Sequence, residues 1–126
     1  MAYGKPGDRR VRAALGFSGA EISAFTGFSG ALRSVPLLAV QGTGDSVNSP
    51  SGTYSYFAEA TRPKYLLKLL GAEHTAPYQN EQPHLGIVAR VSTAFLDRYL
   101  KDEASAGRQL AALGFVPGRS TLQIER

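Results

Sequence analysis

The apolar positions in the first 70 residues fall into three short segments, at residues 10–17, 36–41 and 64–70. Each segment has the length of a β-strand and is closely followed by glycine, which is typical of strands that end in a tight turn. The third segment is apolar almost throughout, as expected of a strand covered on both faces. The pattern therefore predicts a short parallel sheet of about three strands.

Between and after these segments, the apolar positions follow a helical period. Tyr54 and Phe57 predict a helix that stops at the proline before the third strand. Residues 87–100 carry apolar side chains along one stripe at a period near 3.6, and residues 103–113 repeat the pattern more weakly. Strands that alternate with helices predict the α/β fold class, with helices on both faces of the sheet and three layers in all.

The remaining stretches are expected to connect or flank these elements. Residues 1–8 form a loose lead-in, and residues 18–34 form a loop rich in glycine and serine. Residues 71–83 form a second loop, whose prolines and polar residues exclude a helix before about Leu85. Residues 115–126 form a tail that either adds an edge strand or remains mobile. The whole chain is expected to be a single domain, because its length is too small for two.

The composition excludes several classes of protein. The chain has no run of about 18 apolar residues, so no membrane span is expected, and its N-terminus lacks the basic-then-apolar pattern of a secretory signal. The absence of cysteine excludes disulfides, thiolate metal sites and a cysteine nucleophile. This form of the chain is expected to be soluble, while its compartment stays open, secretion as part of a longer protein included.

The formal net charge of +4 arises in part from basic residues clustered before the first apolar segment, namely Lys5, Arg9, Arg10 and Arg12. A nucleic-acid-binding surface would interleave such residues with exposed aromatic side chains or set them on a recognisable motif, and the sequence has neither. The two histidines are separated by a proline-containing loop and have no cysteine or clustered carboxylates around them. We therefore expect no nucleic-acid partner, no metal and no cofactor.

Two titratable residues come shortly after the second and third apolar segments. Asp45 follows a Gly-Thr-Gly turn, and His74 follows Gly-Ala-Glu. Because parallel sheets present their chemistry at the carboxyl ends of neighbouring strands, we expect these two side chains to lie side by side. His84, the other histidine, stands beside the start of the long helix, where a capping or surface role is the simpler interpretation.

The order of an acid followed by a histidine resembles the last two members of the Ser, Asp, His series of α/β-hydrolases. The likeness is to dienelactone hydrolase-, chlorophyllase- and polyester hydrolase-like serine carboxylesterases, in which a Pro-x-Leu-x-x-x-Gly-x-x-Asp strand carries the acid and a later Gly-Ala-x-His carries the base. Asp45 and His74 occupy those positions. The likeness spans roughly residues 8–113, which corresponds to the C-terminal half of such a domain. It implies that His74 is the general base and that Asp45 orients it.

The serine nucleophile of that family has no clear counterpart in this half. The elbow sequence Gly-x-Ser-x-Gly does not occur, and Ser18 and Ser29 lie in Gly-Phe-Ser-Gly-Ala segments that lack the last glycine. Ser18 is retained as the candidate nucleophile within the chain, and the resemblance otherwise implies a serine supplied from outside it. The first strand would then have lost its neighbour. Such an exposed sheet edge predicts self-association or dependence on a missing N-terminal half.

The leading functional hypothesis is a serine-type carboxylic ester hydrolase that acts on a small-molecule or polymer ester. The alternative is a non-catalytic hydrolase-like fragment or binding domain, which keeps the sheet for folding or for binding an apolar ligand or partner. The absent elbow favours the second hypothesis for the isolated chain, whereas the retained Asp45 and His74 favour descent from a working enzyme. The identity of the ester stays open.

Overall fold

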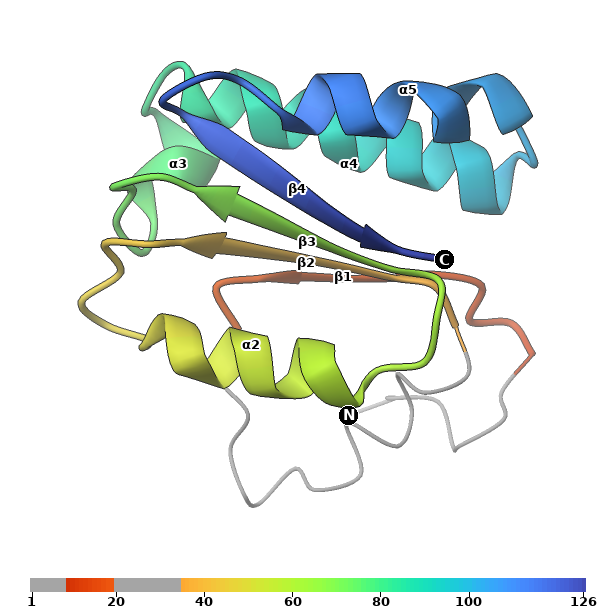
Figure 1. The fold of residues 1–126 in the computed structure, drawn as a ribbon, viewed down its shortest axis with the longest axis horizontal. Coiled ribbons are helices and arrows are strands. Elements are labelled where there is room, and N and C mark those ends of the chain that lie inside the picture. Colours follow the sequence, from red (N-terminus) through yellow and green to blue (C-terminus); the bar gives the residue numbers. More distant parts are fainter. Residues whose placement is uncertain (1–8, 20–34) are drawn as a thin grey trace.

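The computed structural model describes residues 9–19 and 35–126 and shows a four-stranded sheet with helices on both faces (Figure 1). The strands are β1 (Ala14–Phe17), β2 (Leu37–Gly42), β3 (Lys64–Leu69) and β4 (Ser120–Glu125). The helices are α2 (Pro50–Glu59), α3 (Ala76–Gln79), α4 (His84–Leu100) and α5 (Ala104–Gly114). The α/β class predicted from the sequence is thereby confirmed.

The sheet is larger than predicted and is mixed rather than parallel. Strands β1, β2 and β3 run parallel, and the spatial order is β1-β2-β3-β4. Strand β4 pairs antiparallel with β3, from Lys64 opposite Glu125 to Leu69 opposite Ser120. The prediction of about three parallel strands was therefore wrong. The tail at residues 115–126 adds an edge strand, which gives the backbone groups along the outer side of β3 hydrogen-bonding partners.

The two faces of the sheet are covered by different helices, α2 on one side and α4 with α5 on the other (Figure 1). Alternate residues of β2 belong to two separate apolar clusters. Leu38 and Val40 pack with the residues of α4 and α5, whereas Leu37 and Ala39 pack with those of α2. All of β2 is buried, which explains why its sequence is apolar without alternation up to Gln41.

The loop at residues 71–83 contains a short helix that the sequence analysis excluded. Helix α3 occupies Ala76–Gln79, and α4 already begins at His84. Pro77 lies in the first turn of α3, where proline costs no hydrogen bond because the N–H groups of that turn have no partner within the helix. The inference from proline to loop was therefore wrong at this position.

The predicted lead-in at residues 1–8 and most of the predicted loop at residues 18–34 lie outside the residues that the structure describes. Across residues 9–19 and 35–126, none of the helices combines the length and the apolar character needed to cross a bilayer.

Candidate active site

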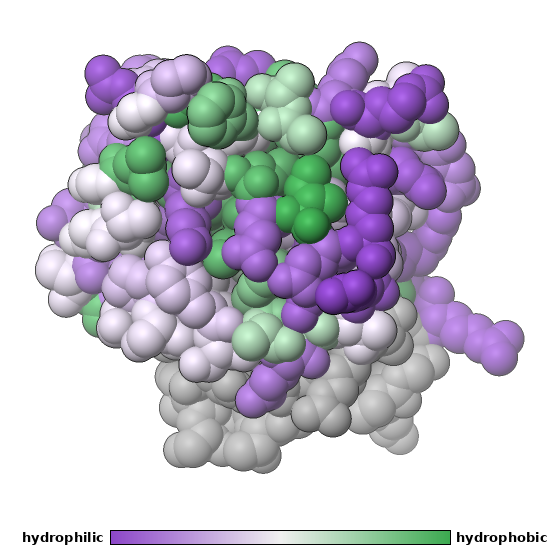
Figure 2. Space-filling view, in the orientation of Figure 1, coloured by the Kyte–Doolittle hydropathy of each residue, from purple (hydrophilic) through white to green (hydrophobic). Residues whose placement is uncertain are grey.

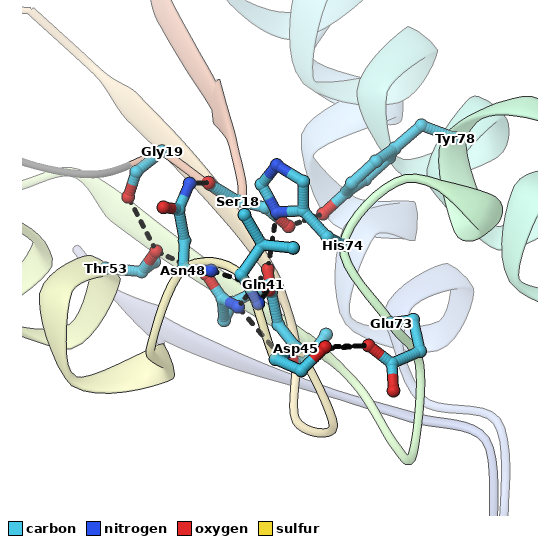
Figure 3. Close-up of polar contacts among 12 residues, drawn as sticks. Ser18, Gly19, Gln41, Asp45, Asn48, Thr53, Glu73, His74 and Tyr78 are labelled. Atoms are coloured by element: carbon cyan, nitrogen blue, oxygen red, sulfur yellow. Dashed lines mark hydrogen bonds and ion pairs between the residues drawn. The ribbon is translucent and has the colours of Figure 1, made fainter.

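Asp45 and His74 meet at the edge of the sheet where β2 and β3 end. The Asp45 Oδ2 atom lies 2.8 Å from the His74 Nδ1 atom, and Figure 3 shows the imidazole above the carboxyl group. The Asp45 side chain has no exposed surface, whereas the His74 side chain is 27% exposed. The sequence placed both residues after neighbouring parallel strands, and the structure brings them together there.

The Asp45 carboxyl group receives four hydrogen bonds. The backbone N–H groups of Val47 and Asn48 donate to Oδ1 at 2.9 and 2.8 Å, and Gln41 Nε2 donates to Oδ2 at 3.2 Å alongside His74. Burial of the carboxyl group would raise its pKa, but the hydrogen bonds from His74, Asn48, Val47 and Gln41 outweigh burial and lower the pKa of Asp45 to about 2. The group is therefore a carboxylate at neutral pH.

The contact with a carboxylate determines which nitrogen of His74 carries the proton. An ionised Asp45 only accepts hydrogen bonds, so Nδ1 of a neutral imidazole carries the hydrogen and Nε2 carries a lone pair. Within residues 9–19 and 35–126, no side chain or backbone group hydrogen-bonds Nε2. His74 is thus held as the tautomer whose Nε2 can accept a proton.

Glycine allows the loops that carry Asp45 and His74 to lie directly against each other. A Cβ atom at Gly42 would lie 2.3 Å from the Ala72 carbonyl oxygen, and one at Gly44 would lie 2.9 Å from the Gly71 carbonyl oxygen. The Gly44 N–H donates to the Ala72 carbonyl at 3.0 Å. The Gly-Thr-Gly turn before Asp45 therefore serves close backbone approach, which sets the distance between the two titratable groups.

A further bridge joins the two loops beside the dyad of Asp45 and His74. Glu73 accepts hydrogen bonds at Oε2 from the Ser46 hydroxyl at 3.0 Å and from the Ser46 N–H at 3.3 Å. These residues immediately follow Asp45 and precede His74, so the bridge fixes the loops at the positions where the dyad needs them (Figure 3).

Gln41 and Thr53 hold Asp45 through a chain of hydrogen bonds, and neither residue was identified from the sequence. Gln41 is fully buried at the end of β2, and its Oε1 accepts a hydrogen bond from Thr53 Oγ1 of α2 at 2.5 Å. This contact orients the amide so that Nε2 donates to Asp45. The sequence did contain one sign of this network, namely the amide of Gln41 in an otherwise apolar strand. A polar side chain that a strand buries needs hydrogen-bonding partners.

Ser18 lies at the same sheet edge, after β1, but its hydroxyl is directed to Tyr78. The Ser18 Oγ and Tyr78 Oη atoms are 2.7 Å apart, and Tyr78 Oη donates to the Val40 carbonyl at 3.3 Å. Burial raises the pKa of Tyr78 to about 12, so its single proton stays in place. Because the Tyr78 hydroxyl uses that proton to donate to the Val40 carbonyl, the Ser18 hydroxyl is the donor in its contact with Tyr78. Among the described residues, no hydrogen bond joins Ser18 to His74.

Tyr78 has a positioning role that the sequence analysis missed. It belongs to α3, directly after the His74 loop, and its hydroxyl connects that helix to the ends of β1 and β2. Its ring also stacks on Phe17, with centroids 5.2 Å apart.

The backbone of Ser18 is held as well. Ser18 has a positive φ of 48° and its carbonyl accepts a hydrogen bond from Asn48 Nδ2 at 2.8 Å. Ser29 lies outside the described residues.

His84 is buried, which contradicts the expectation of a surface role. It is only 6% exposed, with Nδ1 in contact with Glu81 and Nε2 3.3 Å from the Arg119 carbonyl oxygen. These contacts tie the start of α4 to the turn before β4.

The described residues contain no group of three or more His, Asp or Glu side chains arranged to bind a metal ion. A scan against models of protein families and a search of curated proteins found no match to this chain.

Proposed function

We propose that Asp45 and His74 are the acid and the general base of a serine-type carboxylic ester hydrolase. The observation that carries the proposal is the 2.8 Å contact between a buried carboxylate and the Nδ1 atom of His74. This contact leaves the His74 Nε2 atom with a lone pair. A histidine held in this way is suited to take a proton from a hydroxyl group.

In the proposed reaction, His74 Nε2 removes the proton from a serine hydroxyl while the serine oxygen attacks the carbonyl carbon of the ester. The imidazolium that forms is stabilised by Asp45, and it then gives the proton to the departing alcohol. A water molecule, deprotonated by the same nitrogen, releases the acid from the acyl-enzyme. The substrate is a small-molecule or polymer ester, and no cofactor takes part.

The arrangement at β1 supports a nucleophile from outside the described residues. The Ser18 hydroxyl is hydrogen-bonded to Tyr78 and not to His74, and β1 is the outer strand of the described sheet next to the dyad. A further parallel strand beside β1 would deliver a residue to the same edge, because the carboxyl ends of parallel strands meet there. We assign the nucleophile to such a strand, supplied by a preceding segment or by a partner chain.

The proposal is tested first on the base, which does not require the serine. An imidazole with a free lone pair cleaves activated esters slowly by itself, so p-nitrophenyl acetate should release p-nitrophenol faster with the purified chain than with His74→Ala. The chain has two histidines, and His84→Gln is the matched control because His84 is buried and both its nitrogens are occupied. Circular dichroism establishes that each variant is folded.

Three outcomes distinguish the hypotheses. Cleavage that is lost in His74→Ala, kept in His84→Gln and kept in Ser18→Ala supports a dyad whose nucleophile lies elsewhere. Loss in Ser18→Ala as well supports Ser18 as the nucleophile and overturns the assignment of an outside strand. Cleavage equal to that of His74→Ala refutes the proposal. The non-catalytic alternative is then preferred, especially if nitrogen NMR shows that His74 Nε2 carries the proton at neutral pH.

A further inference from the structure

A cavity of about 450 Å³ lies where β3 begins and α4 ends. These ends of β3 and α4 are at the end of the sheet opposite the dyad (Figure 1). Three arginines line it, Arg98, Arg108 and Arg126, together with Tyr65 and Tyr99. Its lining includes no acidic side chain from the described part of the chain. A concave surface of this size that is lined by several cationic side chains and no acidic side chain has the composition of an anion-binding site.

The three arginines have no carboxylate partner among residues 9–19 and 35–126. The neighbouring acids are already engaged, since Asp97 pairs with Lys101 at 2.8 Å and Glu125 lies 3.6 Å from both Arg62 and Lys64. Figure 2 shows strongly hydrophilic side chains gathered at the right-hand side of the molecule, beside a hydrophobic patch at the centre of the same face. Because Asp97 and Glu125 pair with other cations, they do not neutralise the positive charge of the cavity.

Arg98 is held in place rather than extended into solvent. Its side chain crosses α5 at Gly107, where a Cβ atom would lie 2.8 Å from Arg98 Cδ. Its guanidinium group lies over the Tyr99 ring, 5.1 Å from the centroid. Because the Tyr99 ring and Gly107 already restrict the Arg98 side chain, this arginine would lose less conformational entropy on binding an anion.

The tyrosine pair adds a neutral donor to the cavity. The Tyr65 and Tyr99 hydroxyl oxygens are 2.7 Å apart, so one hydroxyl donates to the other and one proton remains without an acceptor among the described residues. Burial and the hydrogen bond with Tyr65 raise the pKa of Tyr99, while Arg98 and Arg126 act on it in the opposite direction. The Tyr99 hydroxyl therefore remains protonated, and both arginines lie close enough to influence it electrostatically.

We propose that this cavity binds the phosphate group of a small phosphate monoester. Guanidinium groups match the geometry of phosphate oxygens, and a dianion suits three arginines better than a single carboxylate does. The remaining hydroxyl proton of the tyrosine pair supplies a further hydrogen bond. The tyrosine rings, Pro63 and Ala104 line the same cavity and offer an apolar surface to the organic part of the ligand. The site is separate from Asp45 and His74 and does not depend on hydrolase activity.

The test is calorimetric titration of the purified chain with phenyl phosphate at low ionic strength. We expect saturable binding at one site, weakened about tenfold by Arg108→Ala, because one charge-assisted hydrogen bond is lost. The double variant Tyr65→Phe, Tyr99→Phe removes the free hydroxyl proton and should weaken binding roughly threefold, as expected for a neutral donor. Arg90→Ala is the matched control, because Arg90 is also an exposed helical arginine but lines a different groove, between α4 and α5, that contains Asp97 and Glu103.

Binding that Arg90→Ala leaves within twofold of the unmodified chain, and that Arg108→Ala weakens, supports the proposal. Equal weakening by both variants would show that phenyl phosphate responds only to the net positive charge, which overturns it. Absence of saturable binding overturns it as well. Backbone NMR shifts on adding phenyl phosphate must fall at the start of β3 and around Arg98, and shifts confined to the His74 loop would place the ligand elsewhere.

Discussion

Replacing Gly42 by alanine gives a direct measure of how tightly the dyad depends on backbone contact. The new Cβ atom would lie 2.3 Å from the Ala72 carbonyl oxygen and 2.9 Å from the Glu73 carbonyl oxygen. Both atoms belong to the backbone and cannot rotate away. The Ala72 oxygen must retreat by about 1 Å to reach the 3.4 Å at which ordinary contact begins. The same shift applied to His74 would lengthen its 2.8 Å contact with Asp45 beyond a hydrogen bond.

The expected cost follows from these contacts. Forcing a methyl group into closely packed backbone costs about 1–3 kcal/mol. Loss of the hydrogen bond from Gly44 to Ala72 adds about 1 kcal/mol. The Gly42→Ala variant should therefore be roughly 2–4 kcal/mol less stable than the unmodified chain. Gly52 in α2 is the control, because a Cβ atom there meets nothing within 4 Å and alanine should stabilise the helix by about 0.5–1 kcal/mol.

Urea unfolding followed by circular dichroism gives both free energies, and the imidazole nitrogen signals of His74 report the contact with Asp45. We expect a lower urea midpoint and an altered His74 tautomer equilibrium in Gly42→Ala only. A Gly42→Ala protein that unfolds at the same urea concentration and keeps Nδ1 protonated would show that the two loops tolerate a larger separation. Glycine at position 42 would then not be what sets the geometry of the dyad.

Three further predictions concern the polar groups that the fold buries. Folding lowers the pKa of Asp45 from 3.8 to about 2, so the carboxylate stabilises the fold fully above pH 3.8 and loses this effect as the pH falls from about 4 to about 2. In Asp45→Asn, the urea midpoint should no longer fall over this pH range because of residue 45. Thr53→Val leaves Gln41 Oε1 without its donor and should cost about 1–3 kcal/mol in urea unfolding, whereas Thr53→Ser should cost less. Lys64→Met removes the donor to two carbonyl groups at the end of α2, and thermal unfolding should show a loss of about 1–3 kcal/mol, with a null result excluding this capping role.

The sequence was sufficient to predict the parallel strands because each is an apolar run that ends near glycine. It was insufficient for β4, whose six residues Ser120–Glu125 include only Leu122 and Ile124 as large apolar side chains. The pairing of β4 with β3 joins residues far apart in the chain, so local pattern carries little information about it. The same limit applies to α3, where the first-turn position of Pro77 depends on where the helix begins.

The candidate site shows the same division between local and long-range information. Asp45 and His74 could be located because each follows a strand, and parallel strands bring their carboxyl ends together. Gln41, Thr53 and Tyr78 could not be assigned, because their partners lie on other elements and the sequence contains no record of those distances. Burial of Gln41 within an apolar strand was the one local sign that a polar network existed.

The two oxygens of Asp45 have different partners, which shows whether stabilising a turn is the only role of this side chain. An aspartate in a turn needs only its Oδ1 contacts with the N–H groups of Val47 and Asn48, which satisfy the local backbone. Its other oxygen, which faces His74 and Gln41, contributes nothing to the turn. Burying an amide in β2 to hold that oxygen costs free energy that an apolar residue would not. Such an arrangement is accounted for if the imidazole must be held with Nε2 free.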